Sequence, residues 1–141
     1  MADDVVLNKA AMIERCVARV REEYAGDARN LTDNITRQDS IILNLQRACE
    51  AAIDLAMHVV RRRRLGIPQE TRDAFRLLQD AGLLPPPLAD RLMRMVGFRN
   101  VAIHDYRRLD LDIVRTIVTT HLDDFLAFAA VLLRQDEPSG G

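Results

Sequence analysis

Residues 41–60 read IILNLQRACEAAIDLAMHVV, and this stretch decides the fold class. Its apolar residues return every three or four positions, which is the spacing of one face of an α-helix. Two sets of residues make that face wide: Ile42, Leu45, Cys49, Ala52, Ala56 and Val59, and beside them Ile41, Ala48, Leu55 and Val60. A helix that is apolar over more than half its girth packs on two neighbours, or on one neighbour and a partner chain. The pattern therefore predicts a long central helix over about 34–64.

A first helix is predicted before the central one. Asp3 or Asp4 can cap its start, and apolar residues recur at helical steps from Val6 to Tyr24. Gly26 is a natural stop for this helix. The triplet Leu31-Thr32-Asp33 has the form of a hydrophobic staple and cap, so it is expected to start the central helix.

Three further helices are predicted after the central one. Gly66 and Pro68 end the central helix, and a shorter helix with an apolar face follows over about 71–81. The prolines at 85–87 can begin a fourth helix but cannot continue one. An acidic start at 109–112 introduces the last helix. The expected fold is an all-α bundle of about five helices.

Composition supports one folded domain. The chain has 141 residues, of which 48% are hydrophobic and 29% are charged, and this balance excludes wholesale disorder. We expect a single domain over 1–135 and a disordered tail over 136–141. The net charge of -1 excludes a bulk polycation, so any contact with nucleic acid has to come from a local basic patch.

Cysteine usage and targeting signals point to a cytoplasmic protein. Cys16 and Cys49 lie on apolar helical faces, without the spacing of a zinc site, so they are expected to be buried, reduced thiols. The acidic N-terminus does not start a secretory signal. We find no stretch close to ~18 uncharged apolar residues, so we expect no membrane partner.

The most informative stretch for function is 98–108, FRNVAIHDYRR. If it stays helical, Arg99 and His104 are offset by roughly 140° and can border one groove without stacking. If the helix ends near Ile103, the following His-Asp-Tyr segment can turn back toward Arg99. The plainer interpretation is a polar helix end in which Arg99 pairs with Asp105 on the surface.

Residues 99–106 match R-N-x-x-x-H-x-Y, which resembles the signature of the HepT toxins, a branch of the HEPN superfamily. The resemblance extends over most of residues 5–133. It includes three further segments of the chain: Asn44-Leu45, Ala52-Ile53-Asp54 with His58, and 71–78. The resemblance implies a HEPN-type helical bundle.

The resemblance further implies a metal-independent ribonuclease that needs no cofactor and acts as a toxin on RNA such as tRNA. The RNA 2′-hydroxyl would attack the adjacent phosphorus and leave a 2′,3′-cyclic phosphate. His104 would act as general acid or base, and Arg99 would stabilise the phosphorane. Asn100 would orient the histidine or donate to a phosphate oxygen. Family members are homodimers whose two motifs face a shared cleft, which fits the wide apolar face of the central helix.

Tyr106 has a separate implied role. In this family the antitoxin is a minimal nucleotidyltransferase that can transfer AMP to the tyrosine of the motif. The added bulk and charge would repel RNA from the cleft. The alternative is a half-buried ring whose hydroxyl contacts water.

Several other polar residues are weaker candidates. HEPN sites often include a polar residue from the second helix, so Asp54 is a supporting candidate. The alternative for Asp54 is a structural pair with His58. Asp105, within the motif, is a second supporting candidate. Candidate RNA contacts are Arg107 and Arg108, which adjoin the motif, and Arg61 and Arg62 from the run 61–64. That run is otherwise a solvated helix end, or a contact for the antitoxin.

Two residues of the last helix receive structural interpretations. His121 is expected at the surface or in a satisfied helix contact, and the pair Asp123-Asp124 on solvated helix surface.

Two other functions remain open at this stage. The chain could be a non-catalytic helical module that binds a nucleotide and partners a nucleotidyltransferase. A small DNA-binding regulator is disfavoured by the near-neutral charge and by the lack of a helix-turn-helix pair.

Overall fold

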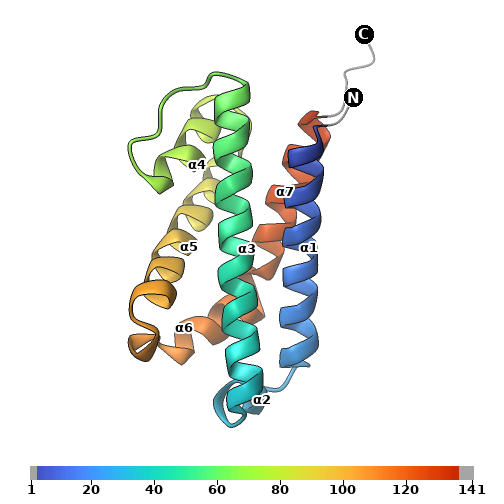
Figure 1. Cartoon of the computed structure of the whole chain (residues 1–141), viewed down its shortest axis with the longest axis vertical. Helices are drawn as coiled ribbons and strands as arrows, with labels where there is room; N and C mark the ends of the chain where they lie inside the picture. Colours follow the sequence, from blue (N-terminus) through green and yellow to red (C-terminus); the bar gives the residue numbers. More distant parts are fainter. Residues whose placement is uncertain (1–2, 137–141) are drawn as a thin grey trace.

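The computed structural model describes residues 3–136, and within them the predicted all-α bundle of five long helices is confirmed (Figure 1). The long helices are α1 (Asp4–Tyr24), α3 (Ile35–Arg62), α4 (Thr71–Asp80), α5 (Pro86–His104) and a continuous helix made of α6 (Leu111–Thr116), the π-helical turn η2 (Ile117–His121) and α7 (Leu122–Asp136). Two short elements connect them: α2 (Arg29–Thr32) and the 3₁₀ turn η1 (Tyr106–Arg108). Asp136 still belongs to α7, and the rest of the predicted tail lies outside the described residues.

The central position of α3 organises the bundle. It packs along α1 on one side and contacts α4, α5 and α7 on the others. The helix α5 runs antiparallel to α3, so the end of α5 and the start of α3 lie at the same end of the molecule (Figure 1). The relative direction of these two helices places the end of the motif helix beside the start of α3, and it decides which residues of the two helices can meet.

The ends of α1 follow the prediction. The Asp3 side chain accepts a hydrogen bond from the Val5 backbone N–H at 2.8 Å. Ala25 and Gly26 adopt left-handed φ values of 50° and 68°, which end the helix.

The start of α3 differs from the prediction. Its N-cap is Asn34, whose Oδ1 accepts from the Arg37 N–H at 3.1 Å, and Asp33 instead follows the short helix α2. The sequence pattern missed α2, because four residues are too few to show a helical period. Leu31, at 0% exposure, anchors α2 to the core.

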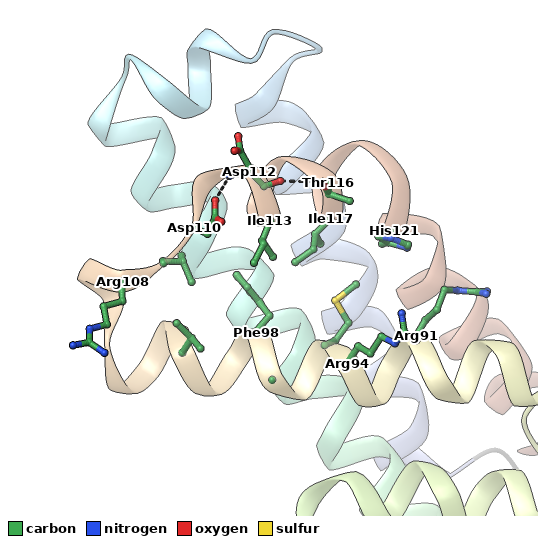
Figure 2. A pocket seen from close by; sticks show the side chains of 14 residues that line it. Arg91, Arg94, Phe98, Arg108, Asp110, Asp112, Ile113, Thr116, Ile117 and His121 are labelled. Carbon is green, nitrogen blue, oxygen red and sulfur yellow. Dashed lines mark hydrogen bonds between the residues drawn. The ribbon is translucent and has the colours of Figure 1, made fainter.

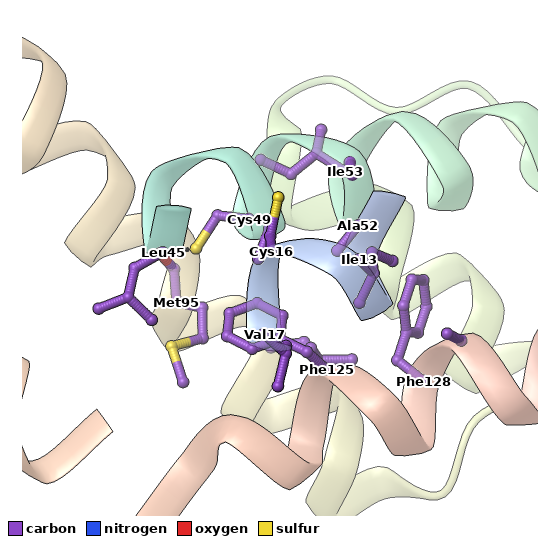
Figure 3. Close-up of a cluster of buried hydrophobic side chains, with 14 of the residues drawn as sticks. Ile13, Cys16, Val17, Leu45, Cys49, Ala52, Ile53, Met95, Phe125 and Phe128 are labelled. Atoms are coloured by element: carbon purple, nitrogen blue, oxygen red, sulfur yellow. Dashed lines mark hydrogen bonds between the residues drawn. The ribbon is translucent and has the colours of Figure 1, made fainter. Parts of the chain in front are cut away.

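The core is built mainly from aliphatic side chains and a few phenylalanines (Figure 3). Phe75 of α4 and Phe128 of α7 are both buried and meet edge-to-face, with ring centroids 5.6 Å apart. Cys16 and Cys49 are free and buried, as expected. Burial raises the pKa of Cys49 to about 12, so this thiol stays protonated at neutral pH.

One helix bears on the expectation that no segment spans a membrane. The continuous helix Leu111–Gln135 is long and apolar enough, by length and composition alone, to cross a membrane. Its large side chains Leu122, Phe125 and Phe128 are buried in the bundle, and a helix that supplies a core passes the same test.

The prediction of solvated surface for Asp123-Asp124 holds for Asp123 and is wrong for Asp124. Asp123 is exposed and pairs with Arg21 at 2.7 Å. Asp124 is buried, and its two oxygens lie 3.0 Å from Arg91 Nε and 3.1 Å from His121 Nδ1. Helix α5 crosses α7 here and covers Asp124, which sequence spacing alone does not indicate. His121 is therefore in a satisfied helix contact, as one of the two expectations had it.

Candidate functional site

The motif 99–106 occupies the last two turns of α5 and the start of η1. Helix α5 continues through His104 and ends because Asp105 leaves the helical region, with φ −153° and ψ 67°. The Asp105 N–H still bonds to the Val101 carbonyl at 2.8 Å, which closes the last turn. Arg99 and His104 thus share one helix, and their five-residue separation places them about 140° apart around its axis.

Arg99 lies on the side of α5 that faces α3. One of its guanidinium nitrogens, Nη1, donates to Asn100 Oδ1 at 2.8 Å. Its positive charge acts on the buried Cys49 thiol of α3, where it opposes the rise in pKa that burial causes. Within residues 3–136 the buried Arg99 Nε has no hydrogen-bond acceptor. The guanidinium is therefore held at one edge and retains unused donors at the other.

The hydrogen bond from Arg99 also determines which atom of the Asn100 side chain remains available. Because Asn100 Oδ1 accepts from Arg99, its amide nitrogen is left as a donor. Asn100 contacts the arginine, and a direct bond from Asn100 to His104 is not among the contacts of the described chain.

His104 is exposed at the C-terminal end of α5. Over residues 3–136, no side chain or backbone group makes a hydrogen bond to its ring. The imidazole is therefore accessible to a ligand that approaches the end of the helix.

Tyr106 is bound to a residue that sequence reasoning missed. Its hydroxyl donates to Asp39 Oδ1 across 2.5 Å, and this bond connects η1 to the second turn of α3. Partial burial, and then the hydrogen bond to the Asp39 carboxylate, raise the pKa of Tyr106 to about 12. The ring is 42% exposed, so it is still accessible. The sequence carried no signal for Asp39, because a single acid on a solvated helix face is common.

Two exposed apolar side chains adjoin these polar groups. Leu43 follows Asp39 by one turn on α3, and Ile103 precedes His104 on α5. Both are 43% exposed. They are large apolar groups on the surface that carries the motif.

The acid after the motif histidine pairs locally. Asp105 Oδ2 lies 3.1 Å from Arg108 Nε, so the alternative pairing of Asp105 with Arg99 is wrong. The backbone N–H of Arg108 donates to the Asp105 carbonyl oxygen. This hydrogen bond forms the 3₁₀ turn and brings the two side chains together. Arg107 is exposed and has no ion pair in the part of the chain that the structure describes. Arg107 and Arg108 remain beside the motif.

The other basic candidates lie at the opposite end of α3. Arg61 comes 22 residues after Asp39, which is roughly 33 Å along a helix. Arg62 Nε is 3.2 Å from Asp3 Oδ2 of the first helix. Arg61 and Arg62 are therefore not part of the surface around His104.

The structure also separates Asp54 from the motif and from His58. Asp54 pairs with Lys9 of α1 at 3.1 Å, and His58 lies 2.6 Å from Asp3 Oδ2. The predicted Asp54–His58 pair is wrong, because α1 packs along α3 and supplies a closer partner to each residue.

A groove of about 620 Å³ lies on another side of α5, between α5 and the α6–η2 segment (Figure 2). Its floor is apolar and includes Met95, Phe98, Val101, Ile113 and Ile117. Arg91, Arg94 and His121 gather at one end, as Figure 2 shows. Among the motif and neighbouring candidates, Arg108 lines the groove, whereas Arg99, Asn100, His104 and Tyr106 do not.

This arrangement offers three chemical elements at one end of the bundle. A guanidinium with unused donors can bind a phosphoryl oxygen. An accessible imidazole can transfer protons near neutral pH. A phenol bound to a carboxylate can be modified at its oxygen.

Comparison with known proteins agrees with the motif. The family model described as Ribonuclease HepT-like matches residues 13–132. The chain is 50% identical over 130 residues to the mRNA nuclease HepT of Shewanella oneidensis. The aligned residues make up 92% of this chain and 97% of that protein.

Two solved structures have the same fold. One is a tri-AMPylated Shewanella oneidensis HEPN toxin in complex with an MNT antitoxin, with a TM-score of 0.87, 50% identity, and coverage of 92% of this chain and 97% of that one. The other is a toxin–antitoxin complex with AMP-PNP, with a TM-score of 0.88, 49% identity, and coverage of 92% and 98%.

Proposed function

The chain belongs to the HepT-like ribonucleases, and on that premise we propose that it cleaves RNA as the toxin of a toxin–antitoxin pair, with His104 and Arg99 as its catalytic residues. The observation that supports this assignment of residues is the incomplete hydrogen bonding of the Arg99 guanidinium. Asn100 fixes one edge of its guanidinium, and the buried Nε has no acceptor among the described residues. A buried donor without an acceptor is rare in a folded protein, and a phosphoryl oxygen of bound RNA is a suitable acceptor.

The proposed reaction uses a nucleophile that the substrate supplies. The RNA 2′-oxygen attacks the adjacent phosphorus, the bond to the 5′-oxygen of the next nucleotide breaks, and a 2′,3′-cyclic phosphate forms. His104 transfers the proton in this step, as general base or general acid. Arg99 stabilises the charge of the phosphorane, which is greater than that of the ground state.

We place the reaction in a cleft between two copies of the chain. Arg99 and His104 point about 140° apart around α5, so one chain presents them on different sides of the helix. A second copy that covers the exposed Leu43 and Ile103 would bring two motifs to one cleft and remove apolar surface from water. We expect this homodimer in the cytoplasm, where its substrates, such as mRNA or tRNA, are found.

We further propose that a minimal nucleotidyltransferase silences the toxin by transferring AMP to Tyr106. The relative in complex with an MNT antitoxin is itself AMPylated, which supports this step. The accessible Tyr106 hydroxyl lies two residues after His104. A phosphodiester at that position would repel the RNA backbone.

Cleavage of RNA in EDTA tests the proposed chemistry. The chain, prepared without its antitoxin, is expected to cut RNA and leave 2′,3′-cyclic phosphate ends, and His104→Ala is expected to leave the RNA intact. Intact mass confirms beforehand that the chain carries no AMP. Absence of cleavage by the unmodified chain would favour the non-catalytic nucleotide-binding module instead.

A second experiment tests the modification. Tyr106→Phe is expected to cleave RNA within about twofold of the wild-type rate, because the hydroxyl takes no part in the reaction. The antitoxin and ATP should silence the wild type and leave this variant active. Equal silencing of both proteins would show that Tyr106 is not the residue that regulates the toxin.

A further inference from the structure

The bond between Tyr106 and Asp39 differs from most of the other aspartate contacts of the described chain. Asp3, Asp54, Asp105, Asp123 and Asp124 each accept from at least one Arg, Lys or His side chain. Asp39 has no such cation partner within residues 3–136, and its side-chain contact is the phenol at 2.5 Å. Its negative charge is thus not neutralised by an ion pair, and an unpaired carboxylate is the more available proton acceptor.

The fold holds these two groups together although they are 67 residues apart in the chain. Asp39 lies near the start of the long helix α3, and η1 follows directly on the end of the antiparallel helix α5. Helices α3 and α5 are fixed by the core, since Ile42 and Ala102 are buried, and η1 has no buried residue of its own but is joined directly to the end of α5. The contact is therefore preorganised, as a catalytic hydrogen bond requires.

Modification at Tyr106 needs a route for the phenolic proton. A phenol has an ordinary pKa of about 10, and the pKa of Tyr106 is raised to about 12, so the phenolate is scarce at neutral pH. A neutral phenol is a weak nucleophile, and an adjacent base that takes its proton during attack increases its reactivity.

We propose that Asp39 is the positioning residue and proton acceptor for AMP transfer to Tyr106. This inference rests on the proposed modification of Tyr106. The phenolic oxygen attacks the α-phosphorus of ATP, the bond from that phosphorus to the bridging oxygen of the β-phosphate breaks, and pyrophosphate leaves. The proton passes from the phenol to Asp39 Oδ1.

The same contact explains a consequence of the transfer. In the ester the oxygen of Tyr106 carries no hydrogen, so its bond to the Asp39 carboxylate is lost. The new phosphodiester is an anion, and it lies near the carboxylate once that group has lost its proton to water. The two charges then repel, which separates η1 from α3 beside His104.

The test measures AMP transfer to the full chain by its own nucleotidyltransferase antitoxin and ATP, with intact mass as the readout. Asp39→Asn keeps an acceptor for the hydrogen bond and cannot take the proton. At pH 7 we expect this variant to be modified about 10²-fold more slowly than the wild type. Asp39→Glu keeps a carboxylate and is expected to recover part of the rate. Asp80→Asn, which changes an exposed aspartate of α4, is the matched control and should match the wild type within twofold.

The pH profile separates a proton acceptor from a merely structural residue. For Asp39→Asn the rate should rise about tenfold per pH unit from pH 7 to 9, because the reaction then depends on the phenolate. The wild-type rate should change little over that range. Thermal melting verifies that each variant is folded.

Two outcomes would overturn the proposal in different ways. In the first, Asp39→Asn is modified with the rate and pH profile of the wild type, and Tyr106→Phe is not modified. This result would refute the role of Asp39 and leave Tyr106 as the target. In the second, the wild type gains no AMP, or Tyr106→Phe is modified as fast as the wild type. Either result would refute the modification of Tyr106 together with the role of Asp39.

Discussion

The helices α1, α3 and α7 and the surface around the motif are stabilised by different forces. The three helices meet through fully buried apolar side chains such as Ile13, Leu45 and Phe128. Around the motif, by contrast, partly buried or exposed polar groups are held by single hydrogen bonds, as in Arg99–Asn100 and Tyr106–Asp39. Burial supplies stability in the first region, and exposure supplies access to a ligand in the second. Substitutions in the two regions should therefore affect different measurements.

The largest expected effect is on activity at the motif. His104→Ala should lower the rate of RNA cleavage by about 10³-fold, because a proton transfer in the transition state is lost. The melting temperature should stay close to that of the wild type, since the ring is exposed and has no hydrogen bond in the described chain. Cleavage kinetics and thermal melting of the same preparations verify both points. A large fall in melting temperature would mean that this surface also supports the fold.

The next effect is on stability within the bundle. Phe128→Ala removes a fully buried ring that packs edge-to-face on Phe75, and it should lower the free energy of unfolding by about 3–5 kcal/mol. Chemical denaturation measures this change. The cleavage rate per folded molecule should remain within about twofold, and a much lower value would show that core packing controls the geometry of the motif.

Substitution of the arginine should have an intermediate effect on activity. Arg99→Lys replaces a planar fork by a single ammonium, which cannot bind Asn100 and a phosphoryl oxygen in the same way. Cleavage should fall by about 10²-fold with little change in stability. Arg19→Lys, on the exposed face of α1, is the matched control. Turnover close to normal in Arg99→Lys would indicate a structural role for Arg99.

The smallest expected effect concerns pH and the first helix. The hydrogen bond to His58, with smaller contributions from the Val5 N–H and from Arg62, lowers the pKa of Asp3 below its ordinary value. The charged carboxylate thus stabilises the fold above pH ~4, and this contribution is lost as the pH falls through the lowered pKa. Asp3→Asn keeps an N-cap acceptor without the charge, so it should melt a few degrees below the wild type at pH 6. Melting curves of the two proteins should converge at strongly acidic pH, and a constant difference would contradict the linkage.

Helix positions could be predicted wherever apolar spacing was long and regular. The periods starting at Val6 and Ile41 placed α1 and α3, and a cap signal at Asp3 agreed with the structure. The short helix α2 and the π-helical turn η2 were missed. The four residues of α2 are too few to show a helical period. The π-helical turn η2 widens the helix locally but leaves the three-to-four spacing of Val114, Ile117 and Val118 unchanged.

The candidate site was predictable only where its residues are close in sequence. Arg99, Asn100, His104 and Tyr106 fall within one short motif that resembles a known family, and the comparisons confirm that family. The partners of distant residues were not predictable. The pairs Asp54–Lys9, Asp3–His58 and Arg91–Asp124 each depend on how two helices pack.

The sequence by itself determined the helical class, the main helices and the motif, because periodicity, caps and short motifs are local properties of the chain. Only the tertiary structure decided that Asp39 meets Tyr106, that Arg61 and Arg62 lie far from His104, and that Asp124 is buried. The physical reason is that hydrophobic burial fixes how the helices pack, and the packing then decides which polar groups from distant parts of the chain come within hydrogen-bond distance.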